Sequence, residues 1–168
     1  MLVYDFENFQ TPFSKEHFGR LLDYCCSACD VFSLTVGWAY YAKEDIVDCL
    51  TPYLLKEIVT THWFSYYSSD KQPLKVRLYP VCAETMEILF AYYPNLFCDD
   101  DIPRLEFPRL EDICFFRGGT LMLGSVTHES ICHAYPSDEE TEAALYDCYS
   151  GWKRDEDDCE QISLKEIQ

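Results

Sequence analysis

The sequence predicts an α+β fold, in which about four helices pack on antiparallel hairpins in a single domain over residues 1–152. Three observations support this class. Apolar residues recur with helical spacing through positions 18–29, and apolar and polar residues alternate through positions 74–79. The adjacent Gly118 and Gly119 supply the backbone freedom that a tight hairpin turn requires.

The first three elements are predicted within residues 1–36. Residues 2–6 are short and aromatic, which favours a strand. A helix is expected over residues 15–29 with Ser14 as its N-cap. One face of this helix collects apolar side chains, namely Phe18, Leu21, Leu22, Cys25, Cys26 and Cys29. The β-branched and aromatic run at 31–36 then predicts a strand.

The middle of the chain combines helical and strand patterns. Over residues 44–59, Pro52 favours two short helices or one kinked helix, because proline is costly inside a helix but common at its first position. The aromatic run at 62–67 favours a strand. Another strand is expected at 74–79, with an outer face formed by Lys75, Arg77 and Tyr79. Apolar spacing predicts a helix over 84–93.

The last part of the chain begins with a predicted loop at 95–110, which is rich in proline and acids. A hairpin follows across residues 112–126, around the two glycines. Ser137, with Glu140 three residues later, predicts the capping box of a final helix. Residues 153–168 are expected to form an acidic, solvated C-terminal tail.

The charge of the chain restricts its partners. The 168 residues include 30 Asp and Glu against 13 Lys and Arg, a formal net charge of -17. Such a surface repels phosphate backbones and anionic membranes, so we expect no direct nucleic acid and no membrane partner. It attracts a basic protein, such as a toxin or a nucleic-acid-binding enzyme. Because no signal peptide or long apolar run is recognisable, a cytoplasmic location is expected.

The partner surface is expected where acids and aromatic residues lie outside the core. Acids from the predicted loop to the start of the hairpin and in the tail are the first candidates, namely Asp99, Asp100, Asp101, Glu111, Asp112, Asp155, Glu156, Asp157 and Asp158. Aromatic residues are enriched at binding hot spots but more often fill cores. The aromatic candidates are Trp38, Tyr40 and Tyr41, for which both interpretations stay open.

Two groups of residues are candidates for chemistry. His128, Cys132 and His133 could ligate a metal, but their spacing matches no standard zinc pattern, and a packed strand explains them as well. Asp5 and Glu7 would lie on the same side of a strand, where paired carboxylates can hold Mg²⁺ or act as acid and base. A solvated edge also explains this pair. Because phosphate-binding glycine motifs are absent from the sequence, we expect no cofactor and assign no catalytic residue.

The chain contains 10 cysteines. In a protein without an export signal they are expected to be reduced thiols, most of them buried as small hydrophobic residues. The C-x-x-C spacing at 26–29 is typical of redox and zinc sites, but it also continues the apolar face of the helix at 15–29. We favour the structural interpretation.

Three segments resemble a family of small uncharacterised proteins from Gram-positive bacteria, some of which carry the name stage III sporulation protein AH. The segments are Tyr-Asp-Phe-Glu-Asn-Phe at 4–9, Thr-His-Trp-Phe at 61–64, and the hairpin sequences at 110–116 and 121–129. The resemblance implies a bacterial cytosolic protein. It brings no known catalytic residues with it.

These observations favour a non-enzymatic, acidic binding protein that engages a basic protein partner. Immunity proteins that block basic toxins have this character, and so do phage or plasmid inhibitors that mimic the charge of nucleic acid. Two alternatives stay open. One is a metal-dependent hydrolase built on the histidine and cysteine group at 128–133 or on Asp5 and Glu7. The other is a structural or sporulation-associated component.

Overall fold

The computed structural model describes residues 1–4, 12–36, 46–92, 96, 110–156 and 161–165. In this part of the chain eight strands form one sheet, and every neighbouring pair is antiparallel. The strand order is β10 (Trp152–Arg154), β1 (Leu2–Tyr4), β9 (Ile131–Ala134), β8 (Thr120–Val126), β7 (Leu110–Arg117), β2 (Val31–Val36), β6 (Leu74–Pro80) and β3 (Lys56–Thr60). A separate two-stranded hairpin is formed by β4 (His62–Trp63) and β5 (Tyr66–Tyr67).

In the described part of the chain four α-helices accompany the sheet, and the predicted α+β class is therefore confirmed. They are α1 (Lys15–Ala28), α2 (Ile46–Leu50), α3 (Ala83–Tyr92) and α4 (Glu139–Cys148). Two short 3-10 helices, η1 (Thr51–Tyr53) and η2 (Thr127–Glu129), complete the elements. No helix among the described residues is long and apolar enough to cross a membrane.

Hydrogen bonds from N-cap side chains determine where α1 and α4 begin. Ser14 caps α1 as predicted, because its hydroxyl accepts a hydrogen bond from the backbone N–H of His17. The prediction for α4 is wrong by one residue. Its N-cap is Asp138 rather than Ser137, and the Asp138 carboxylate accepts from the backbone N–H of Thr141 at 2.8 Å. A carboxylate at this end also complements the helix dipole.

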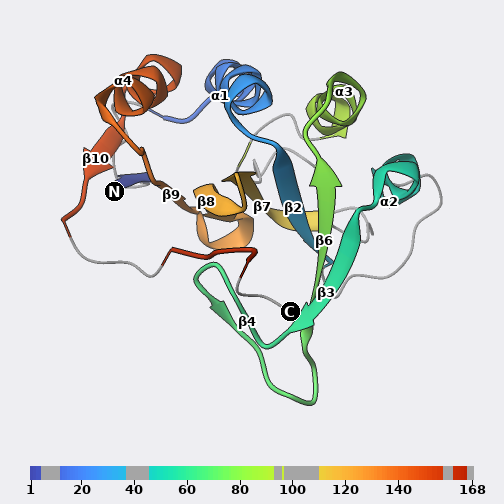
Figure 1. The fold of residues 1–168 in the computed structure, drawn as a ribbon. Helices are drawn as coiled ribbons and strands as arrows, with labels where there is room; N and C mark the ends of the chain where they lie inside the picture. The colour runs from blue at the N-terminus through green and yellow to red at the C-terminus, as the bar shows by residue number, and fades with distance from the viewer. Residues whose placement is uncertain (5–11, 37–45, 93–95, 97–109, 157–160, 166–168) are drawn as a thin grey trace.

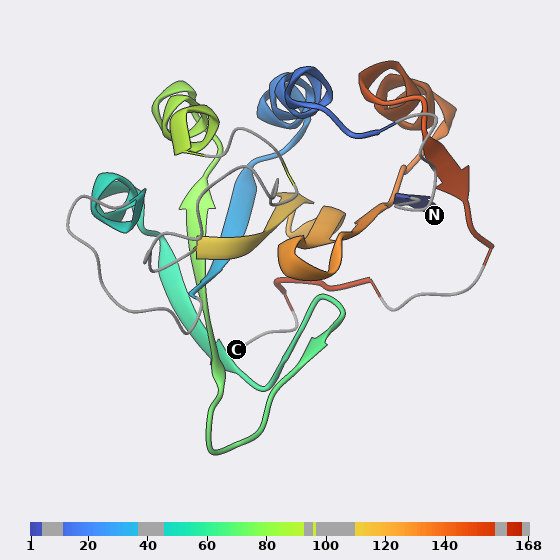
Figure 2. The ribbon, with the colours of Figure 1, turned by 180° about the vertical axis from the view of Figure 1, so that it is seen from behind.

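The four helices lie along one side of the sheet in the order α4, α1, α3, α2 (Figures 1 and 2). Helix and strand side chains share one buried group on this side, the helix-side cluster, which includes Phe18, Leu21, Phe32, Leu34, Tyr79, Leu89, Phe115, Leu123 and Leu145. A second group, the hairpin-side cluster, comprises Ile58, Trp63, Phe64, Leu74, Val76, Leu78, Cys114, Phe116, Leu121 and Val126. Each face of the sheet therefore contributes side chains to a buried cluster.

The alternation of strand side chains separates these two clusters. Ile113 and Phe115 of β7 belong to the helix-side cluster, whereas Cys114 and Phe116 belong to the hairpin-side cluster. The same alternation shows that one prediction for β6 is wrong. Tyr79, predicted on an outer face, is fully buried, since its ring stacks on Phe32 with the ring centroids 5.3 Å apart.

Two predictions for the middle of the chain are partly wrong. The first of the two short helices expected over residues 44–59 is present as α2. The residues expected to form a second helix include η1 and then β3, an edge strand that pairs with β6 from Lys56 to Thr60. Pro52 does lie at the start of a helical turn, but that turn ends at Tyr53. The strand expected at 62–67 is instead the β4–β5 hairpin, in which Ser65 turns with a φ of 48°.

The expected solvated tail is also partly wrong. Lys153 and Arg154 belong to β10, which pairs with β1 at the sheet edge. Further on, Ile162 and Leu164 pack against the hairpin-side cluster, and the backbone N–H of Leu164 donates to Gly119 at 2.7 Å. The C-terminal segment at 161–165 thus forms part of the cover over this face (Figure 1).

Candidate functional site

Asp112, predicted to contact a partner, is a buried structural residue. Only 5% of it is exposed, and its backbone adopts a left-handed φ of 58°. Its carboxylate accepts a hydrogen bond from the backbone N–H of Thr127 at 2.9 Å, and its own N–H donates to the Thr127 hydroxyl at 3.2 Å. The two residues connect the start of β7 to η2, so the prediction for Asp112 is wrong.

The other acidic candidates are dispersed. Glu111 lies in β7 opposite Thr35 of β2. Asp155 is half-buried and holds the first strand through its backbone, because its N–H donates to the carbonyl of Met1 at 3.0 Å. Glu156 is exposed. The remaining acidic candidates lie outside the described residues, namely Asp99, Asp100, Asp101, Asp157 and Asp158.

The aromatic candidates Trp38, Tyr40 and Tyr41 also lie outside the described residues. The β4–β5 hairpin contains both a buried and an exposed aromatic residue. Trp63 is 1% exposed and fills the hairpin-side cluster, whereas Tyr67 is 77% exposed. The Tyr67 ring stacks on His62 with a centroid distance of 4.4 Å.

The histidine and cysteine group at 128–133 does not come together as a metal site. Cys132 and His133 are neighbours on β9, so their side chains lie on opposite faces of the sheet. Cys132 packs in the helix-side cluster, and the His133 ring meets Phe64 edge-on at 5.4 Å on the other face. The backbone of His128 lies in η2. Among the described residues, no group of three or more His, Cys, Asp or Glu could hold a metal ion. Asp5 and Glu7 lie outside those residues.

Burial makes the core thiols and His133 poor reactants. It raises the pKa of Cys114 to about 12 and the pKa of Cys132 well above its ordinary value. It lowers the pKa of His133, although the nearby Asp155 acts in the opposite direction. Cys132 and His133 lie on opposite faces of the sheet, so this thiol and this imidazole cannot form a nucleophile and base pair.

The cysteines of the described part of the chain are all free, namely Cys25, Cys26, Cys29, Cys49, Cys82, Cys114, Cys132 and Cys148. The predicted apolar stripe of α1 holds for Cys25, which is buried, but not for Cys26, which is exposed. Cys29 is the C-cap residue of α1 and is half-buried. Cys98 and Cys159 lie outside the described residues.

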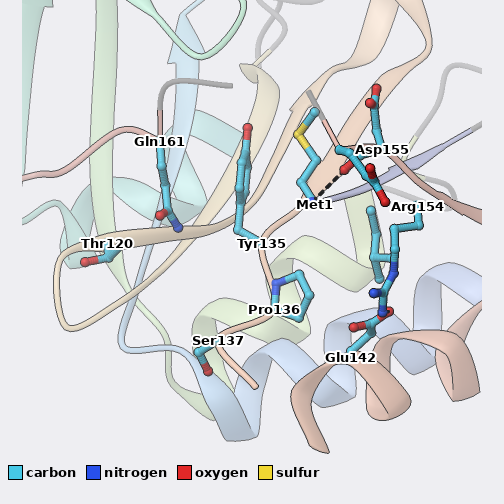
Figure 3. Close-up of a pocket in the computed structure, with 11 residues that line it drawn as sticks. Met1, Thr120, Tyr135, Pro136, Ser137, Glu142, Arg154, Asp155 and Gln161 are labelled. Atoms are coloured by element: carbon cyan, nitrogen blue, oxygen red, sulfur yellow. Dashed lines mark hydrogen bonds and ion pairs between the residues drawn. The ribbon is translucent and has the colours of Figure 1, made fainter. Parts of the chain in front are cut away.

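A pocket with a volume of about 690 Å³ opens near the β10 edge of the sheet (Figure 3). Its walls include Tyr135, Gln161 and Thr120, and Figure 3 shows Arg154 reaching down to Glu142. These two side chains form an ion pair, and the acids Asp155 and Glu156 also line the pocket. The described lining residues include the hydroxyl residues Thr120 and Ser137 and the acids Glu142, Asp155 and Glu156, but no His, Cys or Lys.

The exposed surface of the helices is strongly acidic, and sequence analysis had not singled it out. Its exposed acids come from all four helices, namely Glu16, Asp23, Asp48, Glu84, Glu87, Glu139, Glu140 and Asp147, whereas Glu142 of α4 is half-buried. The cations of these helices are Lys15 and Arg20, both in α1. We call this surface the acidic helix layer. Counting charges at the positions between the apolar stripes would have revealed it.

The far edge of the sheet has the opposite charge balance. Across β3, β6 and the connection between them lie Lys56, Lys71, Lys75 and Arg77, against Glu57 and Asp70. Glu57 and Arg77 pair across the two strands, with Oε2 and Nε 2.8 Å apart. The acids of the described chain therefore gather on the helices rather than being spread evenly.

Comparisons with known proteins identify no relative: no protein-family model, curated protein or solved structure matches the chain. Two features of the described residues thus bear on function. One is the pocket at the β10 edge, which is lined by charged and uncharged residues and contains the ion pair between Arg154 and Glu142. The other is the acidic helix layer, whose acids come from four neighbouring helices.

Proposed function

We propose that this protein is a non-enzymatic binding protein that engages a basic protein partner through the acidic helix layer. The charge distribution of the four helices is the observation that supports the proposal. A surface of one sign raises the encounter rate with a partner of the other sign, and it repels competitors of its own sign. The proposal includes a single-domain protein in the cytoplasm, with all helices packed on one face of the sheet.

Helix stability alone does not account for these acids. Acids in a first turn complement the helix dipole, as Glu139 and Glu140 do in α4. Cations would complement the last turn, yet none of the four helices has one there, and α4 has Asp147 instead. Like charges at this density also destabilise the folded state by mutual repulsion. A bound basic partner would relieve this repulsion, and the relief would contribute to the free energy of binding.

Two kinds of partner fit this charge. The protein would act as an immunity protein on a basic toxin, or as a nucleic-acid mimic that occupies the basic site of a nucleic-acid-binding enzyme. In the mimic, the acids occupy the place of phosphates, so nucleic acid competes with the protein for the partner. Competition by duplex DNA or RNA therefore distinguishes the two kinds.

Zero-length cross-linking tests the proposed surface directly. The protein is incubated with host lysate at low salt, and a carbodiimide joins its carboxylates to lysines of whatever is bound. We expect a basic protein joined to acids of α1, α3 and α4. Bound proteins that are acidic, or links confined to the β3 and β6 edge, would overturn the proposal.

A pair of charge variants provides the matched control. Glu140→Gln with Asp147→Asn removes two exposed acids from α4, and Asp70→Asn with Glu129→Gln removes two exposed acids outside the four helices. The net charge is the same in both variants. Only the α4 variant is expected to lose captured partner, because electrostatic contact depends on where the charge lies.

A further inference from the structure

A narrow apolar groove runs between α1 and α3 within the acidic helix layer. It has a volume of about 230 Å³ and is lined by Leu22, Asp23, Cys26, Met86, Glu87 and Phe90. Leu22 and Met86 are buried and belong to the helix-side cluster, so they form an apolar base. Cys26 and Phe90 are exposed above them, and 45% of Phe90 is accessible.

The groove combines this apolar base with two carboxylates. Asp23 of α1 and Glu87 of α3 are both exposed and line the same space. Within the described part of the chain neither of them forms an ion pair. Two such carboxylates beside apolar atoms repel one another, and a cation between them would be favourable. The lining thus complements a group that is apolar at one end and positive at the other.

Phe90 already interacts with a cation of the protein itself. The Nζ atom of Lys15 lies 5.6 Å from the centroid of the Phe90 ring, within the range of a cation–π interaction. The ring also lies against Gly19, where an added Cβ would be 3.3 Å from it. Gly19 therefore allows α3 to bring an exposed aromatic ring close to α1 at one end of the groove.

The size of the groove restricts its occupant. Pockets for small molecules have volumes of about 300–1,000 Å³. A space of about 230 Å³ is below that range and suits one or two side chains. Its acidic setting selects a positive segment, and its apolar base selects an aromatic or aliphatic side chain beside the charge.

We propose that this groove docks a segment of the basic partner in which an aromatic or aliphatic side chain is flanked by lysine or arginine. The inference rests on the proposed function, and it identifies the part of the acidic helix layer that contacts the partner. The apolar side chain enters over Leu22 and Met86, and the flanking cations meet Asp23 and Glu87. The rest of the acidic helix layer accelerates the encounter without touching this segment.

A synthetic peptide with one tryptophan between two pairs of lysines is the probe. Its association and dissociation rates are measured by stopped-flow fluorescence at low salt. A second peptide carries glycine in place of tryptophan, with the same charge. We expect the glycine peptide to bind at least about tenfold more weakly, because it cannot bury an aromatic side chain.

Two groove variants are compared with variants outside the groove. Cys26→Trp fills the groove from an exposed position, and it should abolish tryptophan-peptide binding, whereas Cys26→Ser should bind normally. Asp23→Asn with Glu87→Gln should raise the dissociation rate by roughly three- to tenfold, because it removes contacts that hold the bound cations. Glu140→Gln with Asp147→Asn removes the same charge from α4 and should lower only the association rate. Thermal unfolding confirms that each variant folds.

The outcomes separate this inference from the proposed function. If the peptide binds the native protein and its folded Cys26→Trp variant equally, the groove is not the docking site, while the acidic helix layer stays as the binding surface. If neither peptide binds at low salt, both proposals fail. If the protein alone forms dimers that Cys26→Trp dissociates, the occupant is a second copy and the inference is overturned.

Discussion

Replacement of Asp112 should destabilise the protein, since the structure makes this residue an internal connection rather than a contact for partners. Asp112→Ala leaves the buried N–H of Thr127 without its acceptor at 2.9 Å, which costs about 1–3 kcal/mol. Alanine must also adopt the left-handed φ of 58°, at a further cost of about 1 kcal/mol. The free energy of unfolding should therefore fall by about 2–4 kcal/mol.

Asp112→Asn is the matched variant. Its amide oxygen can accept from the Thr127 N–H, and asparagine tolerates the left-handed conformation, so we expect a loss of about 1 kcal/mol or less. Urea unfolding at neutral pH measures both variants. A loss below about 0.5 kcal/mol for Asp112→Ala would refute the proposed connection, because an unpaired buried donor costs more than that. Weaker partner binding by a fully folded Asp112→Asn variant would restore the predicted binding role.

Three further predictions concern the hairpin-side face and the thiols. Gly124→Ala should lower the free energy of unfolding by about 1–3 kcal/mol, since its Cβ would lie 2.7 Å from the Phe64 ring; urea unfolding measures this loss. Acidification below about pH 6.5 should destabilise the protein, because burial lowers the pKa of His133 in the folded state. Below that pH the unfolded state binds a proton on this imidazole that the folded state does not, so unfolding becomes more favourable. His133→Gln should weaken this pH dependence of the free energy of unfolding. In the native protein a thiol reagent should modify Cys26 rapidly, but Cys114, with a pKa of about 12, only after unfolding.

Each of these predictions has a contradicting outcome. Phe64→Leu should recover part of the stability lost in Gly124→Ala, and full additivity of the two changes would show that no clash exists. Equal pH dependence of stability in the native protein and in His133→Gln would show that this imidazole is not held neutral. A rapid thiol reaction that persists in Cys26→Ser would assign the reactive thiol to another cysteine.

Elements with a long periodic pattern could be predicted from the sequence. The apolar stripe of α1 and the alternation in β6 are repeated over several residues, so packing and local pattern agree. Edge strand β3 was predicted as part of a helix because its five residues are too few to show a period. Its conformation depends on pairing with β6, which is a tertiary interaction.

The candidate site was harder to predict, because charge in a sequence does not reveal burial. Asp112 lies in an acidic stretch, but the fold uses its carboxylate internally to bind a backbone N–H. Conversely, acids such as Asp23 and Glu87 are separate in sequence, and only the packing of α1 beside α3 places them on one groove. Ile162 and Leu164, in an acidic segment, cover the sheet for the same kind of tertiary reason.

The salt dependence of partner association tests the central claim most directly. The Debye length falls from about 30 Å at 0.01 M salt to about 10 Å at 0.1 M salt, so long-range attraction weakens across this range. With the captured basic partner, stopped-flow measurements should show an association rate that drops steeply with salt. The drop should be shallower for Glu140→Gln with Asp147→Asn than for Asp70→Asn with Glu129→Gln. An association rate that ignores salt, or that changes equally in both variants, would contradict recognition through the acidic helix layer.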